Sequence, residues 1–143
     1  ALGQKTWPVG DRPESANAVK VAGNFMLASA IEAMGEAAAL TRAHGIGAAQ
    51  FLEILTSTLF AAPAYKTYGA MIAAEKYRPA GFEAPTALKD IRLALAAADA
   101  QNVPMPFASI LRDNLMELIA TGGADHDWAA LALLAARRAG LGH

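Results

Sequence analysis

The apolar positions along the chain follow helical spacing and fall into six segments. The longest segment runs from Glu14 to His44, is rich in Ala, Leu and Met, and is followed by Gly45, a residue that commonly ends a helix. Shorter helices are predicted at about 48–57, 62–75, 86–101, 106–121 and 127–139. Alternating strand patterns are essentially absent. The sequence therefore predicts an all-α domain with short loops, in which neighbouring helices lie antiparallel or cross steeply.

The first segment has an unusual distribution of apolar residues. They lie nearly all round the predicted helix, as the following positions show: Val19, Val21, Ala22, Phe25, Met26, Leu27, Ala30, Ile31, Met34, Ala37, Ala38 and Leu40. A helix that is apolar on every side is expected to be buried on every side. We therefore expect this helix to be the central post of a helical bundle or one half of a dimer core.

The segments before and after Glu14 differ in composition. Residues 1–13 contain two prolines and two glycines and are typical of a linker or the tail of a preceding domain, whereas residues 14–143 can form one compact helical domain. The N-terminus lacks the pattern of a signal peptide, and no uncharged apolar run is long enough to span a membrane. Because the chain has no cysteine, disulfides and thiolate metal sites are excluded. These features predict a protein with no membrane partner and are compatible with the cytoplasm.

The charge of the chain argues against a nucleic-acid partner. The chain carries 12 basic and 13 acidic side chains, giving a net charge of −1, and the basic residues are scattered along it. A general nucleic-acid binder needs a basic patch. We therefore expect no nucleic-acid partner.

Lys20 and Asn24 are the most informative polar residues. They stand four residues apart near the start of the long apolar segment, so a helix places the ammonium and the amide on one face. A lysine in such surroundings is either a surface residue with a buried stem or a desolvated group that transfers protons. Base rates and the residues alone favour the surface interpretation.

Two other polar clusters are weaker candidates for chemistry. The sequence Asp125-His126-Asp127 suggests a metal cluster, but it precedes a predicted helix and lies far from the other histidines, so helix capping explains it better and no metal is predicted. Glu32 and Glu36 stand one turn apart and could act as a paired acid and base. Such a pair more often faces solvent or meets Arg42 or another helix.

Three stretches in a fixed order carry a resemblance to a known family. They are VGDRPESANAVKVAGNFMLASAIEAMGEAAALTRAHGI, then FEAPTALKDIRLALAAADAQNVPMP, then GGADHDWAAL. Together they resemble the C-terminal domain of the β-hydroxyacid dehydrogenases, which include 3-hydroxyisobutyrate dehydrogenases and glyoxylate/succinic semialdehyde reductases and belong to the 6-phosphogluconate dehydrogenase superfamily. The resemblance covers roughly residues 5–140. It implies an all-α bundle around one long central helix.

The resemblance also implies roles for five residues. Lys20 and Asn24 match the catalytic lysine and the asparagine four positions on, so Lys20 would act as general acid/base while Asn24 binds the same substrate oxygen or holds the lysine. Lys89 matches the Lys-Asp motif that approaches the substrate and the nicotinamide cofactor. Phe82 matches an aromatic residue that lines the substrate pocket, and Asp90 would support that wall.

The same resemblance implies the partners of the domain. These are NAD or NADP, a small hydroxy acid or aldehyde, and further copies of the chain in a homodimer or higher homo-oligomer. The family's N-terminal Rossmann domain has no counterpart in this sequence, so residues 1–13 would be the linker from it. Because the dinucleotide phosphates would have no place to dock, the chain is expected to be inactive alone.

One departure from the family pattern and two alternative functions are considered next. Gly23 occupies a position where many members carry an additional amide, which affects the substrate assignment and not the lysine role. Imine reductases share the scaffold but usually replace the lysine, so Lys20 argues against that branch. The remaining alternative is a non-catalytic helical dimerisation or interaction module, in which Lys20 would be freely solvated.

Overall fold

The chain folds into helices joined by short loops. A computed structural model describes residues 7–141 and contains α1 (Pro13–Ala43), α2 (Ala48–Thr56), α3 (Pro63–Ala74), α4 (Ala84–Ala100), α5 (Pro106–Leu118) and α6 (Leu131–Arg138). A π-helical turn, η1 (Ile119–Gly123), continues α5, and a 3-10 turn, η2 (Trp128–Ala130), leads into α6. Among the described residues no strand forms, and the only extended pairing is one bridge between Glu83 and Asp127. The prediction of an all-α fold is confirmed.

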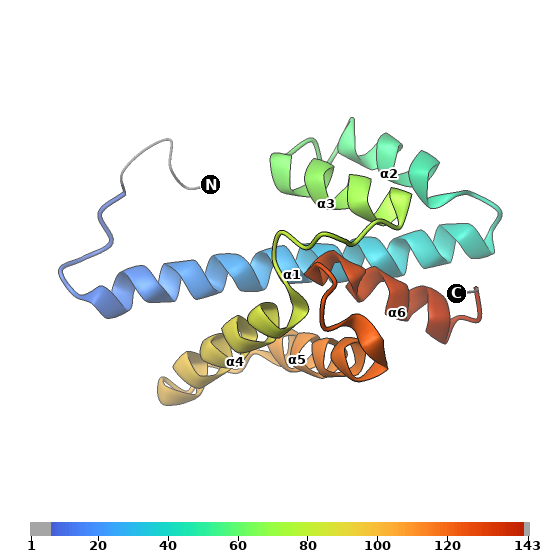
Figure 1. Ribbon diagram of the computed structural model, residues 1–143. Coiled ribbons are helices and arrows are strands. Elements are labelled where there is room, and N and C mark those ends of the chain that lie inside the picture. The colour runs from blue at the N-terminus through green and yellow to red at the C-terminus, as the bar shows by residue number, and fades with distance from the viewer. Residues whose placement is uncertain (1–6, 142–143) are drawn as a thin grey trace.

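The other helices are arranged around α1. In Figure 1, α2 and α3 lie along one side of α1, α4 and α5 lie on the other side, and α6 runs beside its C-terminal half. The first turns of α1 extend beyond the neighbouring helices (Figure 1). The expected bundle around one long central helix is therefore present.

Burial along α1 differs from the sequence expectation. Ile31 and Ala28 are fully buried, but Met26, Leu40 and Val19 expose 69%, 61% and 48% of their surface. The expectation of burial on every side is thus wrong for the single chain. The neighbouring helices leave one stripe of α1 uncovered, and they reach only the C-terminal part of the helix closely.

Proline and glycine set several helix ends. Pro13, Pro63 and Pro106 each occupy the first turn of a helix, where the missing N–H would have no intrahelical partner. Gly45 follows α1 with a φ of +84° and donates its N–H to the Arg42 carbonyl, which ends the helix. The predicted stop at Gly45 is confirmed.

The last two predicted helices begin or end differently from the expectation. The segment predicted at 106–121 is α-helical only to Leu118, because Thr121 and Gly122 leave helical dihedrals within η1. The segment predicted at 127–139 begins with the 3-10 turn η2, for which Asp127 is the N-terminal cap. These irregular turns determine where Trp128 lies.

The described residues before α1 are not helical, and the described helices are too short or too polar to cross a membrane. Residues 7–12 form no helix, and residues 1–6 of the predicted linker lie outside the described residues. Within residues 7–141, no helix has both the length and the apolar character that crossing a membrane requires.

Candidate functional site

A hydrogen bond links the Lys20–Asn24 region of α1 to α4. The Asn24 amide nitrogen donates to the Asp90 carboxylate at 2.8 Å, across 66 positions of sequence. An ionised carboxylate only accepts hydrogen bonds, so this contact fixes which way the amide faces. The Asn24 carbonyl oxygen is therefore left to accept a hydrogen bond from another group.

Asp127 holds together the two loops that complete the site. One of its carboxylate oxygens accepts hydrogen bonds from the backbone N–H groups of Gly81 and Phe82, each at 3.1 Å, and the other accepts from Ala129 N–H at 2.9 Å. Backbone contacts reinforce this junction, since Trp128 N–H donates to the Phe82 carbonyl at 2.9 Å. The loop before α4 and the turn before α6 therefore form one unit.

Three aromatic side chains pack together at this junction. The Phe82 and Trp128 rings lie 4.5 Å apart at 66°, and the Tyr68 and Trp128 rings lie 5.9 Å apart at 79°. Such edge-to-face geometry is the arrangement that aromatic pairs favour. Trp128 is almost completely buried, whereas Tyr68 and Phe82 remain partly exposed. The cluster forms a rigid apolar wall.

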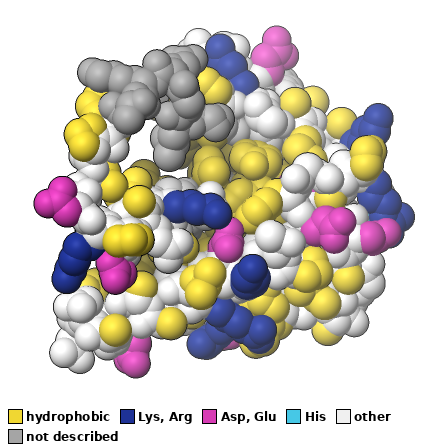
Figure 2. Space-filling view, turned by 60° about the vertical axis from the view of Figure 1, so that its left-hand side comes forward, with side chains coloured by type: hydrophobic (Ala, Val, Ile, Leu, Met, Phe, Trp, Pro, Cys, Tyr) yellow, Lys and Arg dark blue, Asp and Glu magenta, His cyan; other side chains and the backbone are white. Residues whose placement is uncertain are grey.

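The wall borders a pocket of about 500 Å³ that reaches Asn24 on α1. Its lining is mostly apolar, with a few polar groups, and consists of Asn24, Leu27, Thr67, Tyr68, Met71, Pro79, Gly81, Phe82, Asp127 and Trp128. This combination is typical of small-molecule sites. In the space-filling view, a hollow lined by hydrophobic side chains lies next to a basic side chain (Figure 2).

The structure brings together some of the predicted site residues and leaves others apart. Asn24 and Phe82 line the pocket, and Asp90 contacts Asn24. Lys20 and Lys89 are exposed and do not line the pocket in this chain. Lys20 lies one helical turn before Asn24, and Lys89 immediately precedes Asp90, so both lie at the edge of the site.

Sequence reasoning missed Tyr68 and Trp128. The only local signal for Trp128 was its position directly after the predicted capping sequence, and Tyr68 looked like an ordinary aromatic residue of α3. Burial raises the pKa of the Tyr68 phenol, and the nearby Trp128 N–H offsets part of that rise, although the two groups do not form a hydrogen bond.

The Asp125-His126-Asp127 sequence serves the fold. Asp127 caps η2, as predicted, and Asp125 forms an exposed ion pair with Arg78 at 3.0 Å. In the described range, no group of three or more acidic or histidine side chains is arranged to hold a metal ion.

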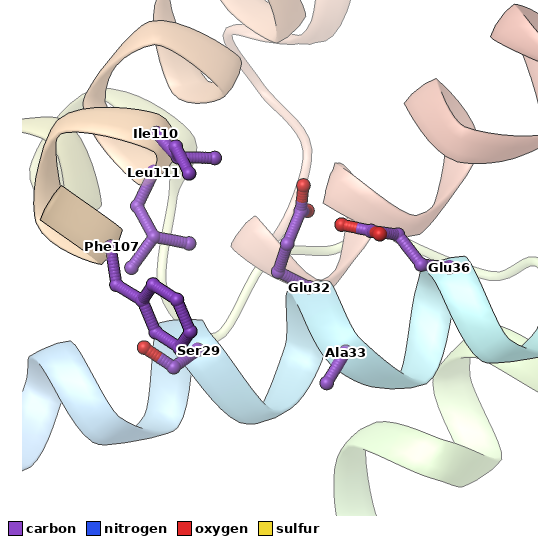
Figure 3. A pocket seen from close by; sticks show the side chains of 7 residues that line it. All are labelled: Ser29, Glu32, Ala33, Glu36, Phe107, Ile110 and Leu111. Atoms are coloured by element: carbon purple, nitrogen blue, oxygen red, sulfur yellow. The ribbon is translucent and has the colours of Figure 1, made fainter.

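A second cavity, of about 470 Å³, contains the other carboxylate pair. Glu32 and Glu36 turn their carboxylates toward one another, and Phe107, Ile110 and Leu111 of α5 form the facing apolar wall (Figure 3). This cavity lies further along α1 than the pocket at Asn24.

Glu32 is anchored to α5 and α6. It accepts a hydrogen bond from the Asn114 amide, and Arg138 donates to the Asn114 carbonyl at 2.9 Å. Burial raises the pKa of Glu32 to about 7, the neighbouring Glu36 adds to the rise, and Asn114 and Arg138 oppose it. Glu32 therefore meets other helices, as expected, whereas Glu36 is exposed and Arg42 forms an ion pair with Glu75.

The fold is shared with half of two solved structures. The fold matches half of a 3-hydroxyisobutyrate dehydrogenase from Salmonella typhimurium with a TM-score of 0.84 at 20% identity, covering 94% of this chain and 47% of that chain. A 3-hydroxyisobutyrate dehydrogenase from Mycobacterium tuberculosis, solved with L-serine, matches with a TM-score of 0.73 at 26% identity, covering 84% of this chain and 43% of that one.

Sequence comparison identifies the family. The family model described as the NAD-binding part of NADP-dependent 3-hydroxyisobutyrate dehydrogenase matches residues 15–139. The chain therefore belongs to this family. It is 40% identical over 131 residues to the uncharacterized oxidoreductase YfjR of Bacillus subtilis, covering 92% of this chain and 46% of the relative.

A second relative extends the similarity to plants. The chain is 28% identical over 130 residues to glyoxylate/succinic semialdehyde reductase 1 of Arabidopsis thaliana, covering 91% of this chain and 44% of the relative. The chain thus spans about half the length of the curated relatives it matches.

Proposed function

We propose that this chain is the helical half of an NAD(P)-dependent dehydrogenase acting on a small 3-hydroxy acid or semialdehyde, with Lys20 as general acid/base. The observation that carries the proposal is the Asn24–Asp90 hydrogen bond at the edge of an aromatic pocket. It holds one face of α1 beside a cavity of suitable size. Lys20 lies on that face, one turn away.

The proposed proton transfer follows from this arrangement. A reduced nicotinamide, when bound, would supply the hydride for the carbonyl carbon. The Lys20 ammonium would donate the proton to the carbonyl oxygen, so that a hydroxyl group forms. In the reverse direction the neutral amine removes the hydroxyl proton. The Asn24 carbonyl oxygen, which the Asp90 contact leaves available, accepts a hydrogen bond from Lys20 or from the substrate hydroxyl.

The cofactor is expected to contact this half at its edge. No glycine-rich turn after a strand exists within residues 7–141, so these residues offer no dinucleotide phosphate cradle. The exposed Lys89, next to Asp90, is suited to approach the nicotinamide end of NAD or NADP. We therefore propose that a separate Rossmann domain holds most of the cofactor and that the helical half alone does not turn over substrate.

We also propose that α1 packs against a second copy of the chain. Its uncovered stripe includes Met26 and Leu40, and the exposed Phe107 and Ile110 on α5 extend the apolar surface. An apolar surface of this kind is typical of a symmetric homodimer interface.

Hydride transfer tests the catalytic proposal. The chain would be expressed joined to the sequence that precedes it in its gene and assayed with 3-hydroxy acids, glyoxylate and succinic semialdehyde, using both nicotinamides. Lys20→Ala should lower kcat/KM by about 10²–10⁴-fold, the usual contribution of general acid–base catalysis. Lys76→Ala is the matched control, because Lys76 is also exposed and lies outside the pocket.

The alternatives predict different results. Activity that survives Lys20→Ala would contradict the assigned role of the lysine. Reduction of cyclic imines in place of the acids and aldehydes would indicate an imine reductase. Absence of any hydride transfer would favour the non-catalytic helical module.

A further inference from the structure

A buried hydrogen-bond donor in the candidate pocket has no acceptor. The indole Nε1 of Trp128 lies in the interior without a hydrogen-bond partner among the described residues. An indole N–H can only donate, and a buried donor without an acceptor lowers stability. Because Trp128 lines the pocket, a group that accepts this hydrogen bond would also border the pocket.

Tyr68 is the neighbour best suited to provide that acceptor. Its ring meets Trp128 edge to face, and the indole lies close enough to offset part of the burial-raised pKa of the phenol. A tyrosine hydroxyl can accept one hydrogen bond while donating another. A small movement of Tyr68 that completes the contact with Trp128 would therefore leave the phenol O–H free to donate elsewhere.

The other polar groups of the pocket are largely committed. Both oxygens of Asp127 accept backbone N–H groups, and the Asn24 amide donates to Asp90. The lining contains no lysine, arginine or histidine, so nothing in it pairs with a carboxylate. The polar group best placed to bind an uncharged oxygen away from Asn24 is therefore Tyr68, with the exposed Thr67 beside it.

We propose that Tyr68, oriented by Trp128, donates a hydrogen bond to an uncharged oxygen on the substrate's side group, so that the pocket selects hydroxylated over purely alkyl 3-hydroxy acids. This inference rests on the proposed function for the identity of the substrate. Tyr68 is the binding residue, and Trp128 is a positioning residue that acts through it. The Phe82 ring, which also lines the pocket, borders the carbon skeleton of the side group.

A matched pair of substrates tests the inference in the same joined protein. The two acids would be 3-hydroxy acids that differ only in carrying a methyl or a hydroxymethyl group at C2. Tyr68→Phe should raise KM for the hydroxymethyl acid about tenfold more than it raises KM for the methyl acid, as expected for the loss of one hydrogen bond. Trp128→Phe should produce a smaller change of the same kind. The double variant should be no worse than Tyr68→Phe.

Equal effects on both acids, or additive effects of the two substitutions, would overturn the inference while leaving the proposed function standing. Calorimetric measurement of how tightly the two acids bind identifies the opposite case, in which the proposed function fails and the inference holds. If no turnover is found but the hydroxymethyl acid binds more tightly than the methyl acid and loses that advantage in Tyr68→Phe, the binding inference holds without the proposed reaction. If neither acid binds and neither is turned over, both fail.

Discussion

The two halves of α1 have different structural roles. In the first half, residues 13–27, only Val21 is buried, and this half carries Lys20 and Asn24. In the second half, residues 28–43, the buried residues are Ala28, Ile31, Met34, Gly35, Ala38 and Ala39. One continuous helix thus anchors itself in the core with its second half and presents polar side chains beside the pocket with its first. Substitutions in the first half can therefore change function with little effect on the stability of the fold.

Two methionines provide the most direct test of this difference. Met34 in the second half is 6% exposed, and Met26 in the first half is 69% exposed. Met34→Ala should lower the free energy of unfolding by about 2–5 kcal/mol, because it leaves a cavity in the core. Met26→Ala should change it by less than about 0.5 kcal/mol. Denaturant unfolding of both variants at low protein concentration measures the two values.

The same pair also tests the proposed dimer. If α1 packs against a second copy, the cost of Met26→Ala should grow when unfolding is repeated at rising protein concentration. Similar costs for the two substitutions at the lowest concentration would contradict the division of α1 into a packing half and a functional half.

Two glycines of α1 extend the comparison to the backbone. A Cβ added at Gly35 would lie 2.6 Å from the Cα of Ala132 in α6, whereas one added at Gly23 would meet nothing within 4 Å. Because backbone atoms cannot swing aside, Gly35→Ala should destabilise the protein by about 1–3 kcal/mol. Gly23→Ala should stabilise it by about 0.5–1 kcal/mol, since alanine favours a helix over glycine.

Thermal or chemical unfolding of the two glycine variants checks these opposite signs. A stabilising Gly35→Ala would mean that α1 and α6 approach less closely than the structure shows. A destabilising Gly23→Ala would mean that the first half of α1 is packed against something that the single chain does not contain.

The helices of this protein could be predicted from the sequence because the signals for them are local. Apolar spacing and Gly45 after α1 act within a few residues of the element they define. Tertiary packing was less predictable, since the apolar pattern of α1 did not reveal that one stripe stays uncovered by its own chain.

The candidate site could be predicted only in part. The spacing of Lys20 and Asn24 placed them on one face, and the resemblance to a family added Phe82, Lys89 and Asp90. The Tyr68–Trp128 contact joins residues 60 positions apart through an irregular 3-10 turn, and no periodic pattern reports such a contact. The role of Lys20 in proton transfer stays a prediction until the joined protein is assayed.

A further expected effect concerns the pH dependence of stability. Glu32 lies in the packing half of α1, and its pKa is raised from 4.5 to about 7, chiefly by burial. A carboxyl group that binds its proton more tightly in the folded state stabilises the fold when protonated. The contribution of Glu32 should therefore be fully present below pH 4.5 and be lost as the pH rises toward and past 7.

Replacing Glu32 with glutamine isolates this contribution, because the amide resembles the protonated acid at every pH. Unfolding free energies of the wild type and Glu32→Gln should be compared from pH 4.5 to 8. The variant should gain stability relative to the wild type as the pH rises, and Glu14→Gln in the first half of α1 serves as the control for loss of one carboxylate. A Glu32→Gln difference that stays constant across this range would show that Glu32 is already ionised in its contact with Asn114, and the second half of α1 would then tolerate a buried charge.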